Sequence, residues 1–354
     1  MNGIRWWLMK HYLIKSYVKL KNIASRISNK VNRTLTDIIF LAQLEKLIMS
    51  KNKGAVILTY HGVDLNEDKR FNMRFFSNKT IDKHFYYLKK YTNVISVSDY
   101  FEQKWDKNKL NVAITFDDGY RNNFLYLKPL VEKYELPVSF YITGLNNTPY
   151  KFIWADFADL ALYFTKSNSF VLGNQEFRKT TNGSFINNEG LTPKLKIKEI
   201  GNWEYKKEFF KLFESEFNEI QKKTELVDYW QIMSDEEIQS CSKSPFISIG
   251  SHSFYHNNLD NISISDAKQE LIKSKNYLEN LTQQPIAELA YPDGAYTEEL
   301  AFWANMELGF SKQLALTFRF EDDCTRPYMR SRTGLYPVDT VPNQLSQIKP
   351  ILSF

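Results

Sequence analysis

The chain has 354 residues, of which 43% are hydrophobic and 15% aromatic, enough for one large domain or two small ones. This composition excludes an intrinsically disordered chain, which would combine low hydrophobicity with high net charge. The net charge of +5 is concentrated in residues 1–36, which carry eight Lys or Arg and no acidic residue, so the pattern argues against a nucleic-acid partner.

Residues 1–50 are predicted to form a basic amphipathic helical segment. Its apolar residues recur at spacings of three and four, as on one helix face: Met9, Leu13, Tyr17, Leu20, Ala24, Ile27 and Val31. With Trp6 and Trp7 near its start, residues 1–36 would lie on an anionic membrane surface. The alternative is a solvated helix that packs on the domain or on a partner.

The sequence shows no membrane-spanning or secretory segment. No stretch approaches the roughly 20 apolar residues of a transmembrane helix. The basic start lacks the clean apolar core and small-residue cleavage site of a signal peptide. We therefore expect a cytoplasmic location, or a peripheral one on the inner membrane face. Cys241 and Cys324 show no metal or redox spacing and are interpreted as structural or incidental.

Short apolar runs alternate with helical patterns from residue 54 onward, and residues 51–345 are predicted to form the main domain. The runs are 55–60, 112–116, 138–142, 246–249, 289–291 and 314–318, and the helical patterns are 121–134, 265–281 and 297–307. Such alternation indicates a parallel sheet covered by helices, in a βα barrel or a doubly wound sheet. No glycine-rich dinucleotide loop follows a run, which disfavours the doubly wound alternative.

The interval of about 150–230 interrupts this alternation. It is rich in Lys, Glu, Asn and Phe. We interpret it as an α+β insertion with a small extended part and one or two helices.

Polar residues follow several of the apolar runs, where the chemistry of a βα barrel is found. They are His61, Asp117 with Asp118, His252 with His256, and Asp293. If the backbone turns helically, His252 and His256 point the same way, and two His with a carboxylate are a common Zn²⁺ ligand set. That spacing also arises by chance.

Asp117 and Asp118 form a carboxylate pair that is costly to bury unless the charges are used. On an extended backbone their side chains would point opposite ways, which suits a metal ligand beside a general base. The alternative is that the pair caps the following helix.

Three motifs in this order resemble those of the polysaccharide deacetylases, the NodB-homology fold of carbohydrate esterase family 4. They are TFDDG at 115–119, HSFYH at 252–256 and AYPDG at 290–294, and the resemblance covers roughly residues 54–340 apart from the insertion. It implies a distorted (β/α)7 barrel with a divalent metal, usually Zn²⁺.

The resemblance also implies a role for each motif. Asp118, His252 and His256 would bind the metal, and Asp117 would be the general base. The third motif would line the substrate groove with Tyr291, Pro292 and Asp293, and the backbone N–H of Asp293 would help to hold the oxyanion.

The chain departs from the common family pattern at two positions. No histidine follows His256, although most members have a late histidine as the acid, and Ala290 stands where the third motif usually has Arg. YHG at 60–62 resembles a branch of the family in which an N-terminal YH supplies the acid, which implies His61. The alternative is a polar residue that closes a strand.

Arg332 resembles an arginine on a late strand of this branch. The resemblance implies that Arg332 pairs with Asp117 and holds it ionised. A surface role for Arg332 is the alternative, since Arg330 is close by. His84 and His11 lie on helical patterns without ligand spacing and are interpreted as structural.

The function predicted is a metal-dependent hydrolase that removes N-acetyl groups from an amino sugar of a polysaccharide or a lipid-linked glycan. An O-acetyl esterase on a polysaccharide is one alternative, because the same residues would serve it. The other is a non-catalytic carbohydrate-binding relative, which would be expected to lose the base or a metal ligand, whereas this chain keeps all four.

Overall fold

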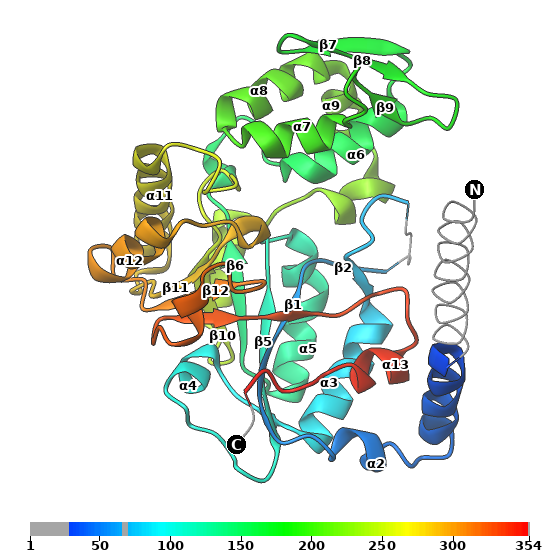
Figure 1. Ribbon diagram of the computed structural model, residues 1–354, viewed down its shortest axis with the longest axis vertical. Helices are drawn as coiled ribbons and strands as arrows, with labels where there is room; N and C mark the ends of the chain where they lie inside the picture. Colours follow the sequence, from blue (N-terminus) through cyan, green and yellow to red (C-terminus); the bar gives the residue numbers. More distant parts are fainter. Residues whose placement is uncertain (1–27, 66–69, 353–354) are drawn as a thin grey trace, which may run out of the picture.

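A parallel sheet rolled into a barrel forms the centre of the molecule in the computed structural model, which describes residues 28–65 and 70–352 (Figure 1). The strand order is β13-β12-β11-β10-β6-β5-β1-β14, and every neighbouring pair is parallel. The strands are β1 (Gly54–Tyr60), β5 (Leu110–Phe116), β6 (Val138–Ile142), β10 (Ile247–Ser251), β11 (Glu288–Ala290), β12 (Lys312–Ala315), β13 (Met329–Ser331) and β14 (Thr333–Gly334), and β4 (Asn93–Val94) also pairs with β5.

One short segment closes the barrel. β13 and β14 stand at the two ends of the strand order, yet only Arg332 separates them in the chain. Because β13 pairs with β12 and β14 pairs with β1, the segment bridges the two edges of the sheet. The predicted βα barrel is confirmed and the doubly wound alternative is wrong. β12 ends at Ala315, earlier than the 314–318 run suggested, because residues 316–317 form a bend.

Side chains of the strands alternate between the barrel interior and the surrounding helices. Ala55 and Ile57 of β1 pack in a cluster with Ala113, Tyr141 and side chains of β11 and β12. The small alanine side chains leave room inside the barrel for Tyr141 and for the guanidinium of Arg332, which lies 5.6 Å from the centroid of the Tyr141 ring.

Helices cover the outside of the barrel (Figure 1). Helical structure spans 121–134, and α11 and α12 lie where the sequence predicts helices. The elements are α2 (Lys46–Met49), α3 (Asn78–Tyr91), α4 (Val97–Phe101), η1 (Asn123–Leu127), α5 (Lys128–Tyr134), η2 (Leu145–Asn147), α10 (Asp235–Ser242), α11 (Ile264–Thr282), η4 (Pro292–Gly294), α12 (Glu298–Met306), η5 (Glu321–Cys324) and α13 (Val341–Ser346), with short strands β2 (Val63–Asp64) and β3 (Phe76–Ser77).

The interval from 150 to 230 forms a separate layer above one end of the barrel (Figure 1). It has its own core, rich in phenylalanine, and more helices than the one or two expected. The polar composition conceals them, because each short helix buries only a few side chains. The elements are α6 (Trp154–Phe164), β7 (Ser169–Leu172), β8 (Gln175–Lys179), β9 (Phe185–Ile186), α7 (Pro193–Ile200), α8 (Trp203–Leu212), α9 (Glu214–Gln221) and η3 (Thr224–Tyr229).

Residues 28–41 are helical and expose several aliphatic side chains, Val31, Leu35, Ile38 and Leu41. The remainder of the predicted basic helix, residues 1–27, lies outside the described residues. Contact with an anionic membrane through residues 1–36 stays a prediction, which vesicle flotation of the full chain against a 1–50 deletion would test. In 28–65 and 70–352, no helix has both the length and the apolar character needed to cross a bilayer.

His84 on α3 is buried, and the hydrogen-bond partners of its imidazole ring favour the uncharged form. Gln344 Nε2 donates to the carbonyls of Tyr336 and Asp339, so Gln344 Oε1 faces His84 Nε2 at 2.8 Å and accepts from it. His84 Nδ1 is left to accept from the Tyr60 hydroxyl at 3.1 Å. These contacts agree with the structural role expected for His84.

Stability is expected to fall as the pH drops from 6.5 toward 4, because His84 must stay neutral in the fold. Burial lowers the pKa of His84 to about 4, below the usual histidine pKa of 6.5, so the unfolded chain binds the proton first. The contribution is fully present above pH 6.5 and decreases by about 3 kcal/mol at pH 4. Urea unfolding across this range measures it. His84→Gln should flatten the pH dependence by about one proton; an equally steep dependence in the variant would contradict the assignment.

Candidate active site

The polar residues predicted at the strand ends meet at one end of the barrel. His61 follows β1, Asp117 and Asp118 follow β5, and His252 follows β10. Parallel strands place their carboxyl ends on the same face, which faces the insertion (Figure 1).

Asp118, His252 and His256 form a compact buried cluster with metal-ligand chemistry. Asp118 Oδ1 lies 3.3 Å from His252 Nε2 and 3.1 Å from His256 Nε2. The three candidate ligand atoms lie within 4.8 Å of one another. Within the described part of the chain, neither carboxylate oxygen of Asp118 has a hydrogen-bond partner. A buried carboxylate without donors is costly unless a cation occupies the site, so these residues fit a metal ion.

The backbone brings these side chains together differently from the prediction. Residues 252–258 are not helical, and Ser253 and His256 adopt left-handed φ angles of 59° and 53°. Asp118 has a φ of 76°, so the Asp pair does not lie on an extended backbone. Both carboxylates therefore face the same centre, with Asp117 Oδ2 4.0 Å from His252 Nε2. The capping alternative is wrong, because Asp117 bonds to side chains instead.

The orientation of His252 is set by the third motif. His252 Nδ1 lies 2.8 Å from the carbonyl oxygen of Ala290. Because that oxygen only accepts, Nδ1 carries a proton, so in the neutral ring Nε2, which faces Asp118, is the nitrogen with a free lone pair. This is the tautomer that binds a metal through Nε2.

Asp117 is ion-paired with Arg332 in a two-pronged contact. Arg332 Nη1 lies 2.7 Å from Asp117 Oδ1 and Nη2 lies 2.8 Å from Oδ2, and both residues are buried. Burial alone would raise the pKa of Asp117, but the charge and hydrogen bonds of Arg332, together with the charges of His252 and His61, outweigh burial and the pKa is lowered. The predicted pairing is present. Arg330 lies elsewhere and donates to the carbonyls of Arg326 and Met329.

The polysaccharide deacetylase family model matches residues 204–311, which contain the second and third motifs. This matched segment, 108 of the 354 residues, is similar to the polysaccharide deacetylases. Among solved structures, the Streptococcus pyogenes deacetylase PplD in complex with acetate is similar at 14% identity, with a TM-score of 0.53, over 84% of this chain and 98% of that one. IcaB from Ammonifex degensii is similar at 15% identity, with a TM-score of 0.50, over 83% of this chain and 96% of that one. These likenesses confirm the barrel fold. No curated protein sequence matches the chain.

The charges of the site act on His61, which follows β1. Burial lowers the pKa of His61 to about 4, the charge of Arg74 acts in the same direction, and Asp118 and Asp117 oppose the shift. The side chain is therefore neutral at neutral pH.

The three predicted groove residues of the third motif lie in different surroundings. The Tyr291 hydroxyl donates to Gln313 Oε1 at 2.7 Å, and the buried Tyr291 ring stacks on Tyr296 in the outer core. Pro292 is also buried. Of the three predicted groove residues, Asp293 lines the pocket, where its carboxylate pairs with Lys198 at 2.9 Å. The expectation that the Tyr291 side chain lines the groove is wrong.

A pocket of about 540 Å³ lies between the barrel end and the insertion. His256 and Asp293 line it from the barrel, and Trp154, Lys194 and Lys198 line it from the insertion. This location beside the candidate metal ligands suits a substrate groove.

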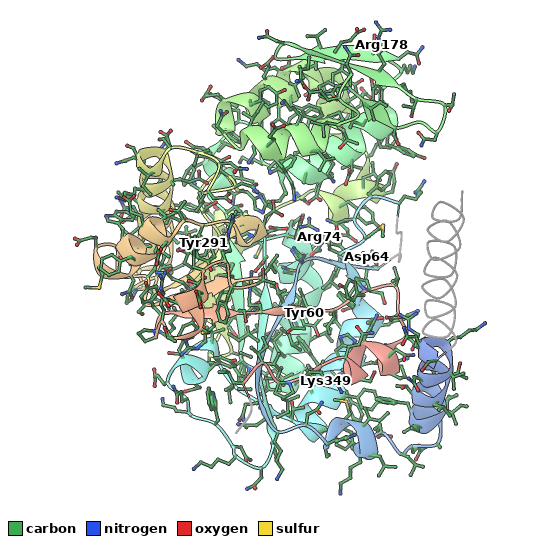
Figure 2. All side chains as sticks on the ribbon, viewed as in Figure 1. Tyr60, Asp64, Arg74, Arg178, Tyr291 and Lys349 are labelled. Atoms are coloured by element: carbon green, nitrogen blue, oxygen red, sulfur yellow. The ribbon has the colours of Figure 1, made fainter. Side chains whose placement is uncertain are left out.

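Arg74 is a pocket residue that the sequence analysis missed. It lies at the end of the barrel that faces the insertion (Figure 2). Its Nη1 is 3.7 Å from Asp118 Oδ2, and its Nη2 is 3.4 Å from Asp156 Oδ1. Burial raises the pKa of Asp156 to about 6, against the opposing charge of Arg74. No motif or spacing around Arg74 signals these contacts, which join segments far apart in the chain.

Proposed function

We propose that this deacetylase removes N-acetyl groups from an amino sugar of a polysaccharide or a lipid-linked glycan, with a divalent metal held by Asp118, His252 and His256. The observation that carries the proposal is the buried, donor-free carboxylate of Asp118 facing two imidazoles beside an ion-paired Asp117. An enzyme of surface-polysaccharide synthesis fits this substrate class.

The donor set favours Zn²⁺. Two imidazole nitrogens and one carboxylate oxygen are a common catalytic zinc set, which leaves a position for water. When bound, the metal would polarise the acetyl carbonyl and lower the pKa of water at the site.

The chain's own residues would supply the proton transfers. Asp117, kept ionised by Arg332, takes a proton from the water that attacks the acetyl carbon. The backbone N–H of Asp293 stabilises the oxyanion. The neutral His61 first receives the proton that Asp117 has taken from the water. It then passes this proton to the departing amine as the amide C–N bond breaks and acetate is released; the low pKa of His61 makes its protonated form a strong donor.

Purified protein is expected to contain about one Zn²⁺ per chain and to release acetate from N-acetylated oligosaccharides. Chelation should abolish acetate release, because the attacking water would lose its activation by the metal. Added Zn²⁺ should restore the release. Elemental analysis and an acetate assay measure both quantities, with acetylated xylan as a parallel substrate. Acetate from xylan alone would favour the O-acetyl esterase. Bound zinc without acetate from any sugar, and no effect of Asp117→Asn on sugar binding, would favour the carbohydrate-binding relative.

A further inference from the structure

Helix α8 of the insertion contacts the loop that carries His256. Lys206 on α8 is only 1% exposed, and its Nζ donates to the His256 carbonyl and to Asn257 Oδ1, each at 2.7 Å. Trp203, one turn earlier, stacks on Tyr255 with ring centroids 4.9 Å apart and an interplanar angle of 16°. One helix of the insertion therefore contacts three consecutive residues of this loop.

Glu270 of α11 contacts the same loop from the barrel. It is buried, and its Oε1 accepts from the backbone N–H of Tyr255 at 2.9 Å. Its Oε2 accepts from Asn257 Nδ2 at 2.7 Å. The Asn257 side chain thus links the ammonium group of Lys206 to the carboxylate of Glu270. Its oxygen accepts from Lys206, and its nitrogen donates to Glu270.

The loop needs external support because its backbone is strained. The left-handed φ of 53° at His256 is unfavourable for a residue with a side chain and persists only where surrounding contacts impose it. Lys206 binds the carbonyl of this strained residue. An amine is costly to bury, so Lys206 needs the acceptors that this loop provides.

We propose that Lys206 is a positioning residue that orients the metal ligand His256, so that the insertion acts on the metal centre as well as forming a wall of the pocket. The inference rests on the metal site of the proposed function. The insertion makes a second contact with the site that is consistent with this proposal: Lys198 of α7 pairs with Asp293 of the third motif at 2.9 Å.

Lys206→Met tests this proposal, because methionine keeps an unbranched apolar stem and removes the donors. Lys207→Met is the matched control, since Lys207 is the next residue on α8 and pairs with exposed Glu204. Zn²⁺ affinity, measured by competition with a chelator, is expected to fall about 10–100-fold in Lys206→Met and to stay at the wild-type value in Lys207→Met. The visible absorption bands of the Co²⁺-loaded protein should shift in Lys206→Met alone.

Wild-type Zn²⁺ affinity and Co²⁺ bands in Lys206→Met would overturn the proposal, even if thermal stability fell. If Lys206→Met does not fold, the double variant Lys206→Met/Glu270→Gln removes both buried charges and is judged by the same two measurements. A wild-type protein that binds no Zn²⁺ would instead overturn the metal centre itself, so the two failures are distinguishable.

Discussion

Asp117→Asn is expected to lower kcat for acetate release by about 10²–10⁴-fold, the usual contribution of a general base. An amide has the size of the carboxylate but cannot take a proton from water. Metal binding should persist, because Asp117 Oδ2 is 4.0 Å from His252 Nε2 whereas Asp118 Oδ1 is 3.3 Å from it. Steady-state kinetics together with zinc analysis of the same preparation measure both effects.

His61→Asn provides the matched comparison, because the proposed acid acts on the leaving group and not on water. An aryl acetate releases a phenolate that needs no protonation. The loss in His61→Asn should therefore be large on an N-acetylated sugar and small on the aryl ester, whereas the loss in Asp117→Asn should persist on both. A kcat of Asp117→Asn within about tenfold of wild type would contradict the role of base.

The sequence located the site because strand ends can be recognised locally. The apolar runs before His61, Asp117 and His252 predicted buried parallel strands, and parallel strands place the residues that follow them on one face. The motifs then implied which residues are ligands. Neither the apolar runs nor the motifs require knowledge of contacts between distant segments.

Contacts between distant segments could not be predicted in this way. Arg74 faces Asp118, and Lys206 binds the carbonyl of His256, across separations that leave no periodicity in the sequence. The positive φ angles at Ser253 and His256 could not be predicted locally either, because glycine and asparagine are the residues from which a left-handed backbone is usually predicted. Spacing of four residues therefore suggested a helical turn where the chain instead makes an irregular loop.

Arg332→Met is expected to lower the free energy of unfolding by about 3–5 kcal/mol and to reduce acetate release strongly. The variant leaves Asp117 buried without its bidentate partner, and it removes a buried side chain from the segment that closes the barrel. The pKa of Asp117 should rise toward the value that burial favours, which weakens it as an ionised base at neutral pH. Urea unfolding and steady-state kinetics measure the two losses.

Arg330→Met is the matched control, because Arg330 lies two residues earlier and donates to backbone carbonyls and not to Asp117. It should retain activity. The double variant Arg332→Met/Asp117→Asn separates stability from chemistry, since it removes the unpaired charge together with the base. It should regain much of the lost stability and remain inactive. If the double variant were no more stable than Arg332→Met, the ion pair would not be the source of the stability, and the role of Arg332 would lie in closing the barrel.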